Sequence, residues 1–214
     1  MAIQISPHVK RWLTGVIAVP LLVLIIVYGS DALFALLIGA VMLIGVHEYN
    51  DMVFDASCRR EKWEGLILTI LIFLAVYTGD PALVLAIMTF SILTVLCLSL
   101  WQVQERTLDV VPIAKVILGL MYVPLLMSHF ILIRRFDDGT LWVFFVLVLA
   151  FAGDTGAFYV GRTWGKRKLL PAVSPGKTME GILGLVGGAV LACVVYQQFL
   201  LPEISVVHAV VLAF

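Results

Sequence analysis

The chain has 214 residues, of which 62% are hydrophobic and 13% are charged, and its formal net charge is zero. This composition excludes an ordinary soluble domain, in which about 25% of the residues are charged, and it indicates a protein that lies in a lipid bilayer. The three cysteines have no paired spacing, so neither a disulfide framework nor a zinc site is predicted.

Apolar runs follow one another along the whole chain, separated by short polar loops. A helix needs roughly 17 to 25 apolar residues to cross about 30 Å of hydrocarbon. We expect spans at residues 12–28, 32–46, 66–78, 82–100, 110–133, 141–160 and 178–201, and an eighth that begins near Val206. The second and third runs are short for a full crossing, so the alternative is that these two segments are strongly tilted or form a re-entrant pair. Gly119, Tyr122 and Pro124 predict a kink in the fifth run.

These runs predict an all-α, polytopic integral membrane protein with about seven to eight transmembrane helices. With no internal repeat or long linker, residues 1–214 are expected to form a single membrane domain. The apolar segment that starts at Val206 continues to Phe214 without a polar cap. We therefore expect the sequence to stop within a helix, as a partial domain.

The basic residues predict the orientation of the spans. With the N-terminus in the cytoplasm, twelve of the fourteen basic residues fall inside, namely Lys10, Arg11, Arg59, Arg60, Lys62, Arg106, Lys115, Arg162, Lys166, Arg167, Lys168 and Lys177. Only Arg134 and Arg135 fall outside. The positive-inside rule therefore places the polar stretch from Gly153 to Gly181 at the cytoplasmic face.

Asp154 lies within an apolar run, roughly 12 Å from the cytoplasmic end of its predicted helix. Intramembrane acids usually mark functional sites, because a charge in lipid is costly. The helical repeat places Asp154, Phe158, Gly161 and Arg162 on one stripe, which would line a funnel open to the cytoplasm. The alternative is an acid that is neutralised or paired and only specifies helix packing.

The loop that follows carries Lys166, Arg167 and Lys168 and then the segment SPGKTMEG, residues 174–181. A basic cluster by itself favours a role in orientation or in attracting anionic lipid. The GKT triplet fails as a P-loop, because Pro171 stands where that motif needs glycine. Ser174 before Pro175 instead predicts a helix N-cap. With Lys177 and Thr178, this helix start predicts a phosphate cradle; the alternative is a plain cap.

Glu180 enters the last long run, followed by Gly184 and Gly187 at i+4 and i+7, and these glycines indicate close approach of a helix or a ligand. Two acids, several cations and a helix start suit a polyphosphate bound through Mg²⁺. A second polar group, HEYNDM at residues 47–52, contains His47 and Asp51 at i,i+4 spacing. It favours an interfacial polar cap over a metal site.

The pairing of DTGAFYVGR (154–162) with SPGKTMEG after a basic loop resembles the phosphatidate cytidylyltransferases, or CDP-diacylglycerol synthases. Glu48, Tyr49 and the segment GLMYVPLLMSH (119–129) agree more weakly. The family form SPKKTWEG differs at Gly176 and Met179. The family's later HGGxxDRxD motif, with acids associated with its metal centre, would lie beyond residue 214, so the chain is expected to be an incomplete catalytic unit.

The resemblance implies transfer of the cytidylyl group from CTP to phosphatidic acid in an inner membrane, with the site facing the cytoplasm and Mg²⁺ as cofactor. Asp154, Lys177 and Glu180 are the candidate catalytic residues, and Asp154 is also the candidate metal ligand. Arg162, Lys166, Ser174 and Thr178 are the candidate substrate-binding residues. A nucleic-acid partner is not expected, and a homodimer is left open.

Two other functions remain open from the sequence. A CTP-dependent polyprenol or dolichol kinase would transfer the γ-phosphate to a lipid hydroxyl. A transporter would use Asp154 as a proton or cation site, although broken helices are indicated only near Pro124. The fate of the α-phosphate of CTP distinguishes these classes.

Overall fold

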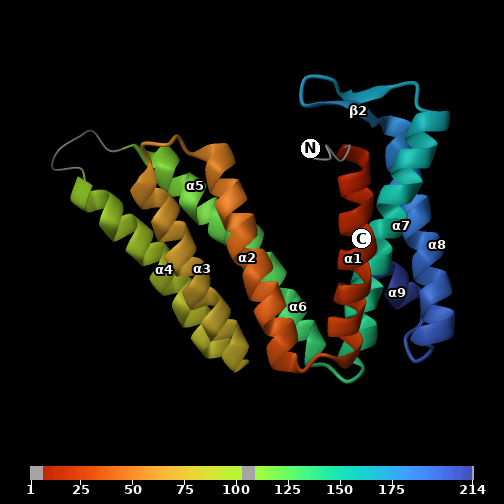
Figure 1. Cartoon of the computed structure of the whole chain (residues 1–214), viewed down its shortest axis with the longest axis horizontal. Helices are drawn as coiled ribbons and strands as arrows, with labels where there is room; N and C mark the ends of the chain where they lie inside the picture. Colours follow the sequence, from red (N-terminus) through yellow and green to blue (C-terminus); the bar gives the residue numbers. More distant parts are fainter. Residues whose placement is uncertain (1–6, 103–108, 214) are drawn as a thin grey trace, which may run out of the picture. The chain divides into compact units, whose positions relative to one another are not determined.

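The computed structural model describes residues 7–102 and 109–213, with side chains for 15–101 and 109–213 (Figure 1). Arg106 and the side chains of Lys10 and Arg11, which we assigned to the cytoplasmic side, lie outside this part. The chain folds as two compact units, Met1–Asp137 and Asp138–Phe214. Each unit is described below by itself, and the expected single membrane domain stays a prediction.

Each predicted span corresponds to a helix. The first unit contains α1 (Pro7–Tyr28), α2 (Asp31–Val53), α3 (Arg59–Thr78), α4 (Pro81–Gln102), α5 (Val110–Leu120), a π-helical turn η1 (Met121–Leu125) and α6 (Leu126–Arg134). The second contains α7 (Gly139–Thr163), β1 (Lys168–Leu170), β2 (Ser174–Thr178), α8 (Met179–Leu200) and α9 (Val206–Leu212). The all-α polytopic class is confirmed, with one small hairpin added among the described residues.

The second and third spans are longer than their apolar runs, because their helices continue into polar sequence. The two helices have 23 and 20 residues, and of the two only α2 is both long and apolar enough to cross a membrane. Within the described part of the chain, five stretches are long and apolar enough to cross a membrane: Asp31–Val53, Pro81–Trp101, Val110–Arg134, Gly139–Thr163 and Met179–Leu200. The number of seven to eight spans stays a prediction. The kink prediction agrees with the π-helical turn, which contains Pro124.

The first unit is held together by packing of α2 against α3, α5 and α6. Its buried apolar side chains include Phe34, Met42, Val46, Ile72, Val76, Val116, Leu120 and Ile131. The helices approach closely at Gly39 and Gly119, where an added Cβ would lie 2.9 Å from the Phe73 ring and 2.6 Å from the Tyr49 ring. Small residues therefore set the spacing of these helices.

Two arginines fasten one end of the first unit. Arg134 bonds the Gly29 carbonyl at 3.3 Å and lies 3.4 Å from the Asp31 carboxylate. Arg135 donates to the Tyr77 carbonyl and stacks over the Tyr77 ring. Gly79, with φ of 77°, ends α3 against the Arg135 side chain. Arg134 and Arg135, which the charge pattern assigns to the non-cytoplasmic side, thus connect the end of α6 with the α1–α2 turn and the α3–α4 turn.

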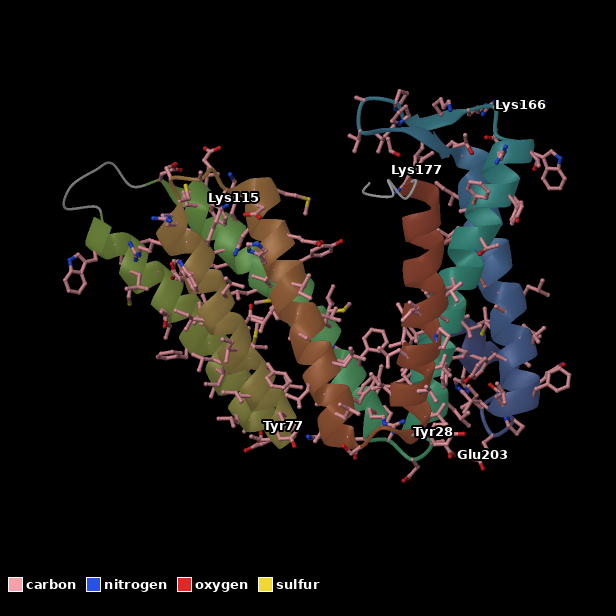
Figure 2. All side chains as sticks on the ribbon, in the orientation of Figure 1. Tyr28, Tyr77, Lys115, Lys166, Lys177 and Glu203 are labelled. Carbon is pink, nitrogen blue, oxygen red and sulfur yellow. The ribbon has the colours of Figure 1, made fainter. Side chains whose placement is uncertain are left out.

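The opposite end of the first unit is closed around the end of α2. Lys115 donates to the Val53 carbonyl, and the Tyr49 hydroxyl donates to the Lys115 carbonyl at 2.8 Å. Lys115 and Tyr77 lie at opposite ends of this unit in Figure 2. Asp51 accepts from Lys62 Nζ at 2.7 Å. These contacts favour the predicted polar cap, and the described residues hold no cluster of three or more His, Cys, Asp or Glu side chains.

In the second unit, α7 and α8 lie against each other along most of their length (Figure 1). A Cβ added to Gly156 would lie 2.2 Å from the Gly184 carbonyl oxygen, and one added to Gly188 would lie 2.5 Å from the Ala152 carbonyl oxygen. The pair is closed at one end by Tyr196, whose hydroxyl donates to the Leu141 carbonyl at 2.7 Å. The backbones touch because these positions lack side chains.

We expect Gly184→Ala to destabilise the second unit. Its new Cβ would lie 2.4 Å from the Gly156 carbonyl oxygen and 2.6 Å from the Val160 Cβ, and such overpacking costs about 1–3 kcal/mol. The matched control is Gly187→Ala on the same helix, where no atom lies within 4 Å of the added Cβ. Thermal unfolding in detergent measures the difference, and equal unfolding temperatures for the two variants would contradict the proposed contact.

Glu64 lies in the polar first turns of α3, before the apolar run 66–78. Its Oε1 is buried without a hydrogen-bond partner among the described residues, and burial raises the pKa of this carboxyl to about 7. The pKa of the same group is about 4.3 in an unfolded chain. The proton is therefore held more tightly in the folded protein, and its contribution to stability is lost as the pH rises through about 7.

We expect the unfolding temperature to fall between about pH 5.5 and pH 8, and Glu64→Gln to reduce that fall because it removes the titrating group. Thermal scans at the two pH values measure both effects. Glu203→Gln, which removes the same charge in the second unit, is the control and should leave the fall in place. An unchanged fall in Glu64→Gln would show that this carboxyl does not carry the pH dependence.

Candidate functional site

The segment from Ser174 to Thr178 is a β-strand, so the predicted helix N-cap at Ser174 is wrong. β2 pairs antiparallel with β1, with Lys168 opposite Thr178 and Leu170 opposite Ser174. Pro175 is tolerated because each strand of a two-stranded hairpin has a free edge. The helix starts later, at Met179, and its cap is Thr178, whose Oγ1 accepts from the Gly181 N–H at 3.1 Å. Pro171, a residue that favours turns, was the signal in the sequence that could have indicated the hairpin.

Glu180 holds the base of this hairpin. Its Oε2 accepts the backbone N–H of Lys166 at 3.0 Å and that of Arg167 at 3.2 Å. The Met179 N–H donates in turn to the Arg167 carbonyl at 2.9 Å. The carboxylate that we expected to act in catalysis or to organise a metal thus contacts main-chain amides of the basic loop, a role that sequence reasoning missed.

Thr178 and two glycines bring the hairpin against the end of α7. Thr178 is only 6% exposed. A Cβ added to Gly165 would lie 2.7 Å from the Thr178 Cγ2, and a Cβ added to Gly161 would lie 3.1 Å from the Thr178 Oγ1. Because the N–H groups of Met179 and Gly181 already have partners, they do not form the free phosphate cradle expected at this helix start. Phosphate binding by Ser174 and Thr178 stays a prediction.

The cationic side chains of the site gather at the hairpin end of the second unit. Lys166 and Lys177 lie at this end and Glu203 at the other (Figure 2). No acidic residue occurs between Asp154 and Glu180 in the sequence, whereas five basic ones do, namely Arg162, Lys166, Arg167, Lys168 and Lys177. All five side chains are exposed. The hairpin end therefore carries a strong positive potential that favours anionic groups.

Asp154 is exposed on α7, whereas its neighbour Gly153 is buried against α8, near Leu185. The predicted stripe is present in part: Phe158 is exposed, and the Arg162 guanidinium lies 5.8 Å from the centre of its ring. Gly161 instead faces Thr178 and Gly181. Asp154 has no hydrogen bond or ion pair within the described residues, so the structure leaves this carboxylate available for a ligand.

A groove of about 460 Å³ runs along the α7 and α8 pair from the base of the hairpin. It is lined by Gly156, Val160, Trp164, Glu180, Leu183, Gly184, Gly187, Gly188 and Leu191. From Glu180 to Leu191 it follows roughly 16 Å of helix, which takes it from the polar end into the apolar section. Apart from Glu180 and the glycines the lining side chains are apolar, so the groove favours apolar groups.

The fit of Mg²⁺ to these residues depends on Asp154. Mg²⁺ is commonly held by one or two carboxylates together with substrate phosphates and water. Asp154 provides one free carboxylate, whereas Glu180 is engaged with the main chain. Asp154 lies eight residues before Arg162 on α7, roughly 12 Å of helix, and a single protein carboxylate is compatible with a cation that arrives with a polyphosphate.

Comparison with known proteins adds an independent finding. A sequence model of the cytidylyltransferase family matches residues 9–214. The phosphatidate cytidylyltransferase of Bacillus subtilis is 28% identical over 196 residues, which cover 88% of this chain and 71% of that protein. The protein of the same name from Pseudomonas aeruginosa is 27% identical over 186 residues, 82% of this chain and 65% of its own length. A Haemophilus influenzae relative, again of that name, is 49% identical over 55 residues.

We expect Glu180→Ala to loosen the hairpin without unfolding the helices. The N–H groups of Lys166 and Arg167 lose their acceptor, so their hydrogen exchange should become faster by about tenfold or more. Glu180→Gln keeps one acceptor oxygen and should give an intermediate rate. Glu203→Ala, at the far end of the unit, is the control. Unchanged exchange at both amides in Glu180→Ala would contradict the clamp.

Proposed function

The chain belongs to the cytidylyltransferase family, and we propose that it transfers the cytidylyl group of CTP to phosphatidic acid. The products are CDP-diacylglycerol and pyrophosphate. The observation that carries the proposal is the family match over residues 9–214, which includes the basic hairpin and the free carboxylate of Asp154. The chain matches 71% and 65% of the length of two relatives.

In the proposed reaction, a phosphate oxygen of phosphatidic acid attacks the α-phosphorus of CTP. A new P–O bond forms, the bond from the α-phosphorus to the bridging oxygen breaks, and pyrophosphate leaves with the electron pair. Negative charge builds up on the phosphoryl oxygens, so fixed cations accelerate the step. The exposed Lys177, Lys166 and Arg162 are the side chains that we assign to these oxygens.

The groove along α7 and α8 supports a lipid substrate. An acyl chain along Leu183, Gly187 and Leu191 would place the lipid phosphate near the base of the hairpin. The groove would thereby hold the acyl chain in a fixed direction, which lowers the entropic cost of reaching the reactive geometry. Glu180 would act indirectly, because its hydrogen bonds hold the backbone of Lys166 and Arg167.

Mg²⁺ remains part of the proposal, with Asp154 as its protein ligand. When bound, it would neutralise charge on the nucleotide phosphates. We also propose that the hairpin faces the cytoplasm of a bacterial inner membrane. The positive-inside distribution supports this orientation, and so does the need for access to CTP. Whether the protein forms a homodimer stays open.

Product analysis tests the reaction itself. With the full-length protein in membranes, label in the α-phosphate of CTP should appear in the lipid, and label in the γ-phosphate should leave in pyrophosphate. Lipid labelled from the γ-phosphate would instead support the lipid kinase alternative. Solute flux without CTP consumption would support the transporter.

Substitutions test the assigned residues in the same assay. Asp154→Asn and Lys177→Ala should each lower kcat by about 100-fold or more, because each removes a charge that acts on the developing phosphoryl charge. Glu203→Gln, at the opposite end of the second unit, should leave turnover unchanged. Wild-type turnover in Asp154→Asn at normal expression would exclude Asp154 from the site.

A further inference from the structure

The turn between β1 and β2 is apolar and exposed, and the proposed reaction leaves it unexplained. Leu170 is 57% exposed and Val173 is 81% exposed, and Pro171 and Ala172 between them are exposed as well. Four contiguous apolar residues at the end of a hairpin otherwise rich in lysine and arginine form a surface that water solvates poorly. Such a surface on a folded protein commonly marks an interaction site. We call these residues, 170–173, the hairpin tip.

The hairpin is fixed at the level where the helices leave the bilayer. α7 ends at Thr163 and α8 begins at Met179, and both are apolar and long enough to cross a membrane. The hydrogen bonds of Glu180 and Met179 hold the start of the hairpin against these helix ends. Figure 1 shows the hairpin running sideways from the pair and not onward along the helix axes. The tip therefore stays near the height of the lipid headgroups.

The surroundings of the tip match an anionic lipid surface. The exposed cations Arg167 and Lys168 precede it, just before and at the start of β1, and no acid occurs between residues 154 and 180. Trp164, 69% exposed, stands at the end of α7, where indole rings favour the membrane interface. Apolar side chains beside basic ones are the combination by which interfacial segments bind membranes, through apolar burial and attraction to anionic headgroups.

We propose that the hairpin lies on the bilayer, with its tip between the headgroups and the first acyl carbons and the Arg167 and Lys168 side chains on lipid phosphates. The occupant of this surface is the lipid leaflet into which α7 and α8 already extend. This inference does not rest on the proposed reaction, since it uses only the tip, the clamp and the charge. It gives the hairpin a second support at the end distant from Glu180.

Depth-dependent fluorescence quenching tests the proposal on the full-length protein in lipid nanodiscs. Cys58, Cys97 and Cys193 are replaced by alanine or serine, and an environment-sensitive fluorophore is attached to Val173→Cys. Gly176→Cys on β2 is the matched control, because an added Cβ there meets no atom within 4 Å. Nitroxides on shallow acyl carbons report contact with lipid, and iodide reports contact with water.

We expect the label at residue 173 to be quenched by the lipid nitroxide at least about twofold more strongly than the label at residue 176, and less strongly by iodide. Equal quenching of both labels by iodide, with none by the nitroxide, would overturn the proposal in favour of a solvated loop. Protection of residue 173 from both quenchers would overturn it in favour of a protein contact.

The charge component has its own test. In nanodiscs that contain phosphatidylglycerol, nitroxide quenching at residue 173 should exceed that in phosphatidylcholine alone. The double variant Arg167→Gln and Lys168→Gln should lose this difference while its label stays in contact with lipid. Quenching that is independent of both lipid charge and the double variant would exclude the basic residues from docking.

Discussion

The second unit depends on one contact, the direct approach of the α7 and α8 backbones. Gly156, Gly184 and Gly188 face carbonyl oxygens across the pair, at distances that a single Cβ would fill. In a bilayer, helices gain little from hydrophobic burial against each other, so close van der Waals packing carries much of their association. The same contact sets the groove beside the pair and the separation of the two helix ends between which the hairpin is held.

The hairpin in turn depends on Glu180. A carboxylate that accepts two main-chain N–H groups fixes the direction of the loop, and with it the backbone positions from which the Lys166 and Arg167 side chains extend. Cations held in place stabilise developing phosphoryl charge without first having to reorganise. A flexible lysine-rich loop would carry the same net charge but would lack this advantage. Glu180 thus links helix packing to the proposed chemistry.

The sequence predicted the helices well and the polar loop poorly. The apolar runs located every helix, because length and composition suffice where the bilayer requires a helix. Pro124 predicted the irregular turn, which the structure has at Met121–Leu125. Ser174 before Pro175 was assigned to a helix start, because local capping signals were weighed without the pairing to Lys168–Leu170. That pairing depends on a turn through Pro171 and on the clamp at the base of the hairpin.

The sequence by itself determined that the protein lies in a membrane, where its helices run and that acid, cations and glycines gather between residues 153 and 181. These properties follow from composition and helical periodicity, which are local. Only the tertiary structure decided which glycines touch, Gly184 but not Gly187, and that Asp154 stays free while Glu180 is bound to the main chain. Such distinctions arise because residues of the same or similar type, two glycines or two carboxylates, meet different neighbours once the chain has folded.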